Sequence, residues 1–247
     1  MRILALDTAT EACSVALVSG DEVIVRFGQR GPSHAPQVLG MVGDVLAEAE
    51  VSLSALDGIA ASIGPGAFTG VRISVAVAQG LAFGAGLAVI PVTTLEALAS
   101  AALRSGAAGA LACLDARMGE VYWGCFTADG RRGVIPSSTA RVGRPESVVM
   151  PEPAGWPARS LHGAYRGIGR GFAAYPLLAA LPGLLLDPQD SQAVPDAREF
   201  ARLGALRLRL GEGLDPADLC PLYLRDKVAL TEAERLAQRA LSSNCHT

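Results

Sequence analysis

The sequence predicts an α/β protein made of two lobes that share one design. In each half, a short apolar run ends in an aspartate, Asp7 or Asp115, and a turn and a second strand-like run follow. Because this unit recurs about a domain apart, it indicates two lobes of one ancestral design. The 247 residues are enough for two modest cores. The glycine-rich stretch 105–109 predicts the boundary, with an N-terminal lobe over 1–106 and a C-terminal lobe over 107–247.

The first lobe is expected to open with three strands and to continue with alternating helices and strands. Apolar or alternating runs separated by polar turns predict an antiparallel meander over 2–6, 14–18 and 22–27. Apolar periodicity and glycine breaks then predict a helix over 33–50, a strand over 58–63, a helix over 69–84, a strand over 88–92 and a helix over 94–103.

The second lobe is expected to restart with a pair of strands and to end in helices. Alternation and turn residues predict strands over 110–114 and 120–126 and a loop-rich segment over 129–159. A helix is predicted over 193–210, because Asp196 is a suitable N-cap and Glu199 follows three residues later. Gly211 is a suitable C-cap for it. A last helix, over about 231–241, is expected to pack back on the N-terminal lobe.

Composition argues against direct nucleic-acid binding and for a cytoplasmic location. The formal net charge is −3, and Lys227 is the only lysine. A protein that binds nucleic acid directly usually carries a basic face, because neutralised phosphates supply most of the non-specific affinity. We therefore expect any RNA to be held by a partner. The five cysteines form no CxxC pair and no signal peptide precedes the first strand, so reduced thiols in the cytoplasm are expected.

One uncharged segment, residues 73–94, is about as long as a membrane span. Ser74, Gln79, Pro91 and three glycines interrupt it. Such interruptions are unfavourable in a lipid-facing helix, and nothing else in the sequence supports insertion. We expect a buried helix followed by a strand, and no membrane association.

The histidines offer no metal site. His34, His162 and His246 are far apart in the sequence, and no second histidine follows His34 at a helical spacing. The sequence also has no GxSxG nucleophile elbow and no phosphate loop of the GxxxxGKS or GxxxxGKT type. We therefore expect neither a bound metal nor a catalytic residue in this chain.

The glycine-rich loop 64–70 is the most specific local feature, and two interpretations of it remain open. A glycine turn between a strand and a helix exposes backbone N–H groups that could hold an anion. The same turn could instead serve only to connect the strand to the helix, with Phe68 anchored in the core. The two aspartates could bind a metal–nucleotide through water, or they could be ordinary turn residues. The candidate vestigial nucleotide or anion site comprises Asp7, Thr8, Gly64, Gly66 and Asp115.

The helices over 33–50 and 69–84 form a candidate partner interface. The second is apolar around its whole circumference, so it must be buried on two sides. One side can pack on the sheet, and the other needs either more of this chain or another subunit. Small residues such as Ala76, Gly80 and Gly84 would let a second helix approach closely. The residues expected to contact the partner are Val38, Met41, Val42, Val45, Val71, Val75, Ala78, Gln79 and Ala82.

Four motifs in order resemble the TsaB (YeaZ) family over nearly the whole chain. They are residues 3–10 (ILALDTAT), 62–73 (SIGPGAFTGVRI), 115–122 (DARMGEVY) and 221–225 (PLYLR). The resemblance implies a two-lobed acetate kinase/Hsp70/actin-like fold, which is a duplicated ribonuclease H-like fold. It also implies a non-catalytic subunit required for the N6-threonylcarbamoyladenosine modification of tRNA next to the anticodon.

The resemblance further implies the partners. The catalytic subunit TsaD would bind this chain as a heterodimer or heterotetramer, and TsaE and tRNA would be reached only through that complex. The chain alone would form a homodimer through the same helices. ATP or ADP and Mg²⁺ would be bound by the partner complex, since residues 163–171 depart from the glycine loop that holds adenosine in active relatives.

Two other functions remain to be weighed. One is an ATP-dependent phosphotransferase of the actin-like ATPase superfamily that uses Asp7 and the loop at Gly64. The other is a metalloprotease, an older description of relatives, which the histidine spacing does not support.

Overall fold

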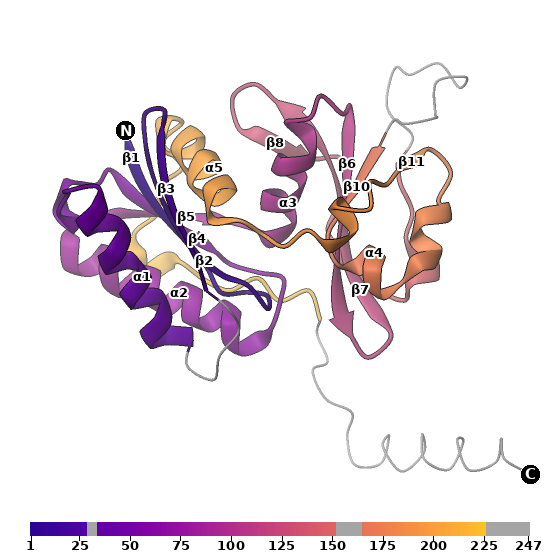
Figure 1. Cartoon of the computed structure of the whole chain (residues 1–247), viewed down its shortest axis with the longest axis horizontal. Coiled ribbons are helices and arrows are strands. Elements are labelled where there is room, and N and C mark those ends of the chain that lie inside the picture. Colours follow the sequence, from indigo (N-terminus) through magenta and orange to yellow (C-terminus); the bar gives the residue numbers. More distant parts are fainter. Residues whose placement is uncertain (29–33, 152–164, 226–247) are drawn as a thin grey trace, which may run out of the picture.

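Two mixed β-sheets with the same strand order form the frame of the protein (Figure 1). The computed structural model describes residues 1–28, 34–151 and 165–225. The predictions for His162, His246 and the helix over 231–241 lie outside these residues. The first sheet has the order β3-β2-β1-β4-β5 and comprises β1 (Arg2–Asp7), β2 (Cys13–Ser19), β3 (Glu22–Gly28), β4 (Gly58–Ser62) and β5 (Ala88–Val92).

The second sheet repeats the first, strand for strand. Its order is β11-β10-β6-β7-β8, and β9 also pairs with β7. In each sheet the first three strands are antiparallel, a fourth strand pairs with the first in parallel, and a fifth pairs with the fourth in parallel. The strands are β6 (Gly109–Arg117), β7 (Glu120–Asp129), β8 (Gly133–Pro136), β9 (Arg141–Gly143), β10 (Tyr165–Ile168) and β11 (Leu184–Leu185). The predicted duplication and the predicted fold class are confirmed.

Five α-helices accompany the sheets within the described part of the chain. They are α1 (His34–Glu48), α2 (Phe68–Ala85), α3 (Thr94–Leu103), α4 (Gly171–Ala174) and α5 (Ala197–Arg209). Short 3₁₀ helices lie at Leu53–Ala55, Pro145–Ser147, Pro176–Ala180, Asp190–Gln192 and Pro216–Asp218. The predicted strands and the helices of the first lobe are confirmed to within a few residues. The helix predicted from residue 193 begins only at Ala197, because Asp196 caps it by accepting a hydrogen bond from the Arg198 amide.

The first sheet has helices on both faces, so its central strand β1 is buried on both sides. Its alternate residues Leu4 and Leu6 pack toward α1 and α2, while Ile3 and Ala5 face the opposite way. That opposite side is covered by α5 and α3, which lie between the two sheets (Figure 1). On the outside of the second sheet, α4 and the following turns complete a third core. Cys13, Cys113 and Cys125 are free thiols buried in these cores, as expected for small apolar residues.

Helices α3 and α5 are exchanged between the halves of the chain. The first-half helix α3 packs on β6 and β7, whereas the second-half helix α5 packs on β1 and β2. After α5, Leu214 forms an antiparallel bridge with Val89 of β5. The boundary at residue 106 therefore separates the two sheets along the chain. The same boundary does not assign each helix to the sheet that it covers, since α5 follows the boundary in the sequence but packs on the first sheet.

Helix α2 is long and apolar enough to cross a membrane by length and composition alone. A core helix of a soluble protein meets the same criteria. In this structure Val75 and Ala78 of α2 are buried against the first sheet.

Candidate functional site

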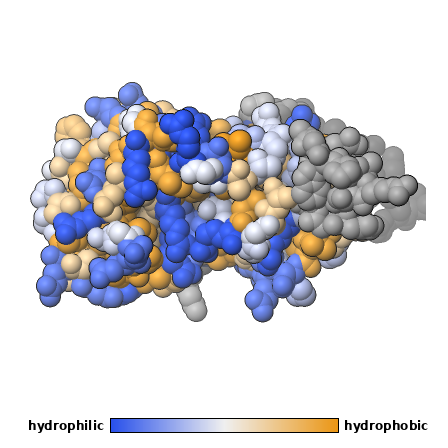
Figure 2. All heavy atoms as spheres, turned by 90° about the horizontal axis from the view of Figure 1, so that it is seen from above, coloured by the Kyte–Doolittle hydropathy of each residue, from blue (hydrophilic) through white to orange (hydrophobic). Residues whose placement is uncertain are grey.

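A cleft of about 740 Å³ opens between the two lobes. The first lobe contributes Glu11 and Phe68, and the second contributes Asp115 and Arg170. The extended segment after α5 closes one side, with Tyr223 and Arg225 facing the space. The cleft is thus formed jointly by both lobes and is lined by charged and apolar side chains together. Hydrophilic side chains gather over the middle of the molecule on a different face, the one seen from above in Figure 2.

The charged groups of the cleft are already paired. Arg170 of the second lobe forms an ion pair with Glu11 of the first. Arg225 pairs with Glu120 and also donates to the Ala116 carbonyl at 3.1 Å. Asp115 accepts hydrogen bonds from Tyr175 Oη at 3.2 Å and from the Arg117 amide at 2.8 Å, and it pairs with the Arg117 guanidinium. The Arg170–Glu11 pair joins the two lobes, and Asp115 is engaged by residues of its own lobe.

Asp7 does not face the cleft, which corrects the expectation that it could bind a metal–nucleotide. Its side chain is fully buried, and its Oδ1 atom accepts the Ala9 amide at 2.9 Å. Among the described residues, its Oδ2 atom and the Ser62 hydroxyl have no hydrogen-bond partner. Burial raises the pKa of Asp7 to about 6, although the hydrogen bond from the Ala9 amide acts in the opposite direction. A buried carboxyl of this kind cannot present its charge to a ligand.

The glycine loop packs against the β1–β2 turn and does not form an open cradle for an anion. A Cβ atom at Gly66 would lie 2.1 Å from the Ala9 carbonyl oxygen, and one at Gly70 would lie 2.0 Å from that of Thr8. The Ala67 amide donates to the Ala9 carbonyl at 2.7 Å, and the Thr8 hydroxyl donates to the Gly70 carbonyl at 2.6 Å. The glycines are therefore required for close packing on the β1–β2 turn.

The five residues predicted for a nucleotide site are thus not brought together around open space. Gly66 and Asp115 line the cleft, whereas Asp7, Thr8 and Gly64 lie behind it in the packed loop. In the described part of residues 163–171, a Cβ atom at Gly169 would lie 2.2 Å from the Cys113 carbonyl oxygen. That turn packs on β6.

The helices α1 and α2 present a different face from the one predicted. Eight of the nine residues selected from the sequence are buried in this chain's own core; they are Val38, Met41, Val42, Val45, Val71, Val75, Ala78 and Ala82. The ninth, Gln79, is half-buried and donates to the Pro216 and Leu219 carbonyls at 2.9 and 3.1 Å. This corrects the residue selection, because these side chains face the sheet and the segment after α5.

Glycine or alanine occupies six exposed positions of α1 and α2, beside larger exposed residues such as Leu39 and Asp44. The six are Gly40, Gly43 and Ala47 on α1 and Ala76, Gly80 and Gly84 on α2. We call these six residues the outer helical face. A Cβ atom at any of its four glycines would have no described atom within 4 Å, so packing among the described residues does not require them. Phe83 beside it is 82% exposed.

Three functional candidates at the edge of this face were missed by sequence reasoning. Phe68, expected in the core, is 44% exposed, and Arg72 and Tyr223 are exposed beside it. Phe68 and Arg72 also line a hollow of about 310 Å³ at the start of α2. The motifs at 62–73 and 221–225 contain these residues, but no local pattern indicates that two segments so far apart in the chain meet here.

Comparisons find similarity along nearly the whole chain. The family model described as "TsaD: tRNA N6-adenosine threonylcarbamoyltransferase" matches residues 29–153. The tRNA threonylcarbamoyladenosine biosynthesis protein TsaB of Escherichia coli is 39% identical over 93% of this chain and 96% of its own. The protein of the same name from Haemophilus influenzae is 36% identical over 92% and 95%.

Solved structures agree with the fold described above. YeaZ from Pseudomonas aeruginosa has a TM-score of 0.79 and 39% identity, over 90% of this chain and 99% of its own. A second structure from that organism, described as an uncharacterized protein with similarity to peptidase YEAZ, has a TM-score of 0.80 over 91% and 99%.

Proposed function

The chain belongs to the TsaB (YeaZ) family, and from this membership we propose that it is a non-catalytic subunit in tRNA threonylcarbamoyladenosine biosynthesis. In this role it binds a TsaD catalytic subunit and activates it. The protein acts in the cytoplasm, forms a heterodimer or heterotetramer with TsaD, and reaches TsaE and tRNA through that complex. ATP or ADP and Mg²⁺ belong to the complex, and the chain alone forms a homodimer.

The observation that carries the proposal is the outer helical face. Glycine in a helix interior costs about 0.5–1 kcal/mol relative to alanine. Gly43 and Gly80 lie in the middle of helices, and a methyl group at either position would meet none of the residues that the structure describes. Small residues in such positions favour close approach by a second helix. The face therefore suits a helical partner.

The cleft supports an accessory role rather than an independent reaction. An autonomous phosphotransferase needs a carboxylate free to bind a metal–nucleotide, but Asp7 is buried and Asp115 is engaged by Arg117 and Tyr175. Among the described residues, no group of three or more metal-ligating side chains occurs. No observation favours the phosphotransferase or the metalloprotease.

The docking face is tested by placing a charge on it. Ala76→Glu leaves the fold intact, because Ala76 is exposed, and it should weaken binding to full-length TsaD roughly a hundredfold through burial of an unpaired charge. Ala179→Glu, at an exposed alanine on the second lobe, is the matched control and should bind normally. Calorimetric titration of each variant measures the affinity. Equal affinity for both variants would refute docking on this face.

Activation is tested by reconstitution of the tRNA modification. TsaD and TsaE are combined with tRNA and with TsaC, which by the family resemblance makes the threonylcarbamoyl adenylate, and the modified nucleoside is quantified with and without this chain. We expect modification to require the chain and to fall with Ala76→Glu in proportion to the lost affinity. Full modification without the chain would contradict the proposal.

A further inference from the structure

Arg72 is the one charged side chain of α2. It is exposed at the edge of the hollow of about 310 Å³, whose other lining residues are Ala35, Phe68, Thr69, Ile73, Ala76 and Val77. The hollow is therefore mostly apolar, and Ala76 connects it to the outer helical face. An arginine in this position gives the docking face a single positive charge beside an apolar recess.

Two aromatic rings hold the Arg72 side chain in place. Its guanidinium carbon lies 3.7 Å from the centre of the Phe68 ring, one helical turn earlier. Its Nε atom donates to the Tyr223 hydroxyl at 2.9 Å, and the two rings are 5.7 Å apart. Tyr223 belongs to the segment after α5, so the site is built from residues 151 positions apart. Such stacking fixes the plane of the guanidinium before any partner binds.

The two terminal nitrogens of the Arg72 guanidinium are the part of it that could bind a partner. In the ranges that the structure describes, neither terminal nitrogen of Arg72 has a hydrogen-bond partner, and no carboxylate forms an ion pair with it. The arginines of the neighbouring cleft differ, because Arg170 and Arg225 each have an acidic partner. A planar fork with four N–H groups matches the two oxygens of a carboxylate.

We propose that Arg72 is a preorganised anchor for a carboxylate side chain of the partner that docks on the outer helical face, with an apolar neighbour of that carboxylate filling the hollow. The inference rests on the proposed function and adds the chemistry of the partner's surface. Arginine side chains held by aromatic groups lose little freedom on binding, and they are frequent among the residues that dominate interface affinity.

A protein carboxylate fits this site better than an RNA phosphate. The chain carries a net charge of −3, and the surroundings of Arg72 within the hollow are apolar apart from Thr69. A phosphate backbone is held by several cations along a basic surface. A single arginine beside an apolar recess instead suits one acidic residue and one aliphatic residue on a helix.

The test is a titration of the full-length chain with full-length TsaD. Arg72→Met should weaken binding roughly tenfold or more, and Arg72→Lys should also weaken it, because an ammonium neither stacks on Phe68 in the same way nor forms the fork. The loss should shrink as ionic strength rises, since salt screens the wild-type contact. Arg209→Met, at an exposed arginine of α5, is the matched control and should leave affinity unchanged.

The outcomes separate this inference from the proposed function. If the wild-type chain does not bind TsaD, the proposed function fails and the inference fails with it. If the wild type binds, Ala76→Glu does not, and Arg72→Met binds as tightly as the wild type, the docking face stands and the anchor is refuted. Thermal unfolding of Arg72→Met close to that of the wild type shows that any loss of affinity comes from the contact.

Discussion

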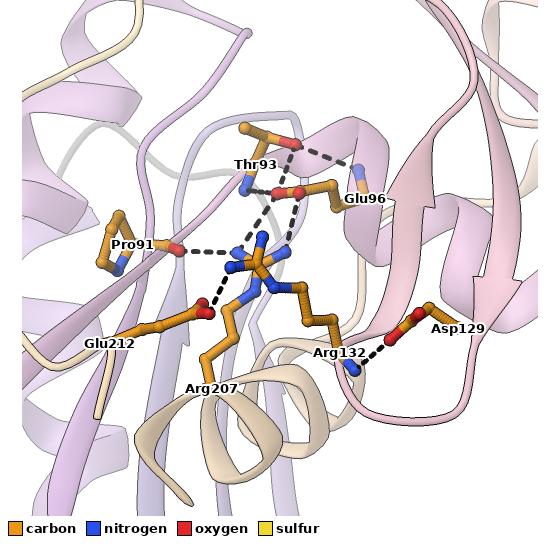
Figure 3. Close-up of polar contacts among 7 residues, drawn as sticks. All are labelled: Pro91, Thr93, Glu96, Asp129, Arg132, Arg207 and Glu212. Atoms are coloured by element: carbon orange, nitrogen blue, oxygen red, sulfur yellow. Dashed lines mark hydrogen bonds and ion pairs between the residues drawn. The ribbon is translucent and has the colours of Figure 1, made fainter. Parts of the chain in front are cut away.

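Arg207 of α5 forms a bidentate ion pair with Glu96 of α3, with nitrogen–oxygen distances of 2.7 and 3.4 Å (Figure 3). The Arg207 guanidinium also donates to the Pro91 carbonyl at 2.9 Å. Glu96 in turn accepts the Thr93 amide at 2.8 Å, which completes the capping box at the start of α3. One carboxylate therefore caps one helix and ties it to another from the opposite half of the chain.

The two roles of Glu96 are separable by substitution. Glu96→Gln keeps an acceptor for the Thr93 amide but removes the charge that faces Arg207, whose side chain is only 12% exposed. We expect a loss of about 1–3 kcal/mol in the free energy of unfolding. Glu96→Ala should cost about 1 kcal/mol more, because the cap is lost as well. Urea unfolding measures both, and equal losses would show that the cap contributes nothing.

Replacing two glycines of α2, Gly70 and Gly80, by alanine should change the free energy of unfolding in opposite directions. Gly70→Ala places a Cβ atom 2.0 Å from the Thr8 carbonyl oxygen, so the loop must shift, at a cost of about 1–3 kcal/mol. Gly80→Ala meets no atom within 4 Å and should stabilise the chain by about 0.5–1 kcal/mol. Thermal and urea unfolding of both variants test this, and a stable Gly70→Ala would contradict the packing described for the loop.

A larger side chain at Gly80 should separate stability from partner binding. Gly80→Leu is accommodated by the isolated chain, since the position faces open space. At a close helix–helix contact it would clash, and we expect TsaD affinity to fall roughly tenfold or more. Unfolding and calorimetric titration of the same preparation provide both values. Wild-type affinity in a stable Gly80→Leu variant would place the partner elsewhere.

Asp7 should make the stability of the protein depend on pH. Its pKa is raised from 3.8 to about 6 in the folded chain, so the folded state retains a proton that the unfolded state has lost. The stabilisation from this group is complete below about pH 4 and is lost as the pH rises toward and through 6. Asp7→Asn, which cannot ionise, should therefore be more stable than the wild type by about 1–3 kcal/mol at pH 8.

The measurement for Asp7 is urea unfolding at pH 4.5 and pH 8. The advantage of Asp7→Asn should shrink at the lower pH. Asp129→Asn is a suitable control at an exposed turn, where hydrogen bonds from the Arg132 and Arg131 amides lower the pKa of the carboxyl. An advantage of Asp7→Asn that is the same at both pH values would show that Asp7 does not titrate in this range.

Local patterns predicted the elements well, because strands, caps and glycine breaks depend on neighbouring residues. Strand β5 and helix α3 fall at the predicted bounds, and Asp196 caps α5 as expected. Glu199, however, does not complete a capping box; it is buried, accepts the Ser100 hydroxyl at 2.8 Å and pairs with Arg104. Arg202 of the same helix pairs with it as well, but Ser100 of α3 and Arg104 at the end of α3 lie about a hundred positions away, and no local pattern reveals them.

The candidate site was harder to predict for a related reason. In α2, valine and alanine occur on all sides, so periodicity could not tell the face against the sheet from the outer one. Ala78 and Ala82 face the sheet although Ala76, of the same type, is exposed, so residue type did not distinguish the two faces. The arrangement of Arg72 between Phe68 and Tyr223 depends on where the chain returns after α5, which is set by tertiary packing.

The exchange of α3 and α5 has a consequence for the modularity of the protein. A fragment ending at residue 106 would contain α3 without β6 and β7 and would leave one face of its own sheet bare, because α5 covers it. The complementary fragment would carry α5 with no surface to pack on. The two sheets thus share one pattern, as expected after a duplication, but neither half of the chain has a complete core of its own. We therefore expect the two halves to fold only together.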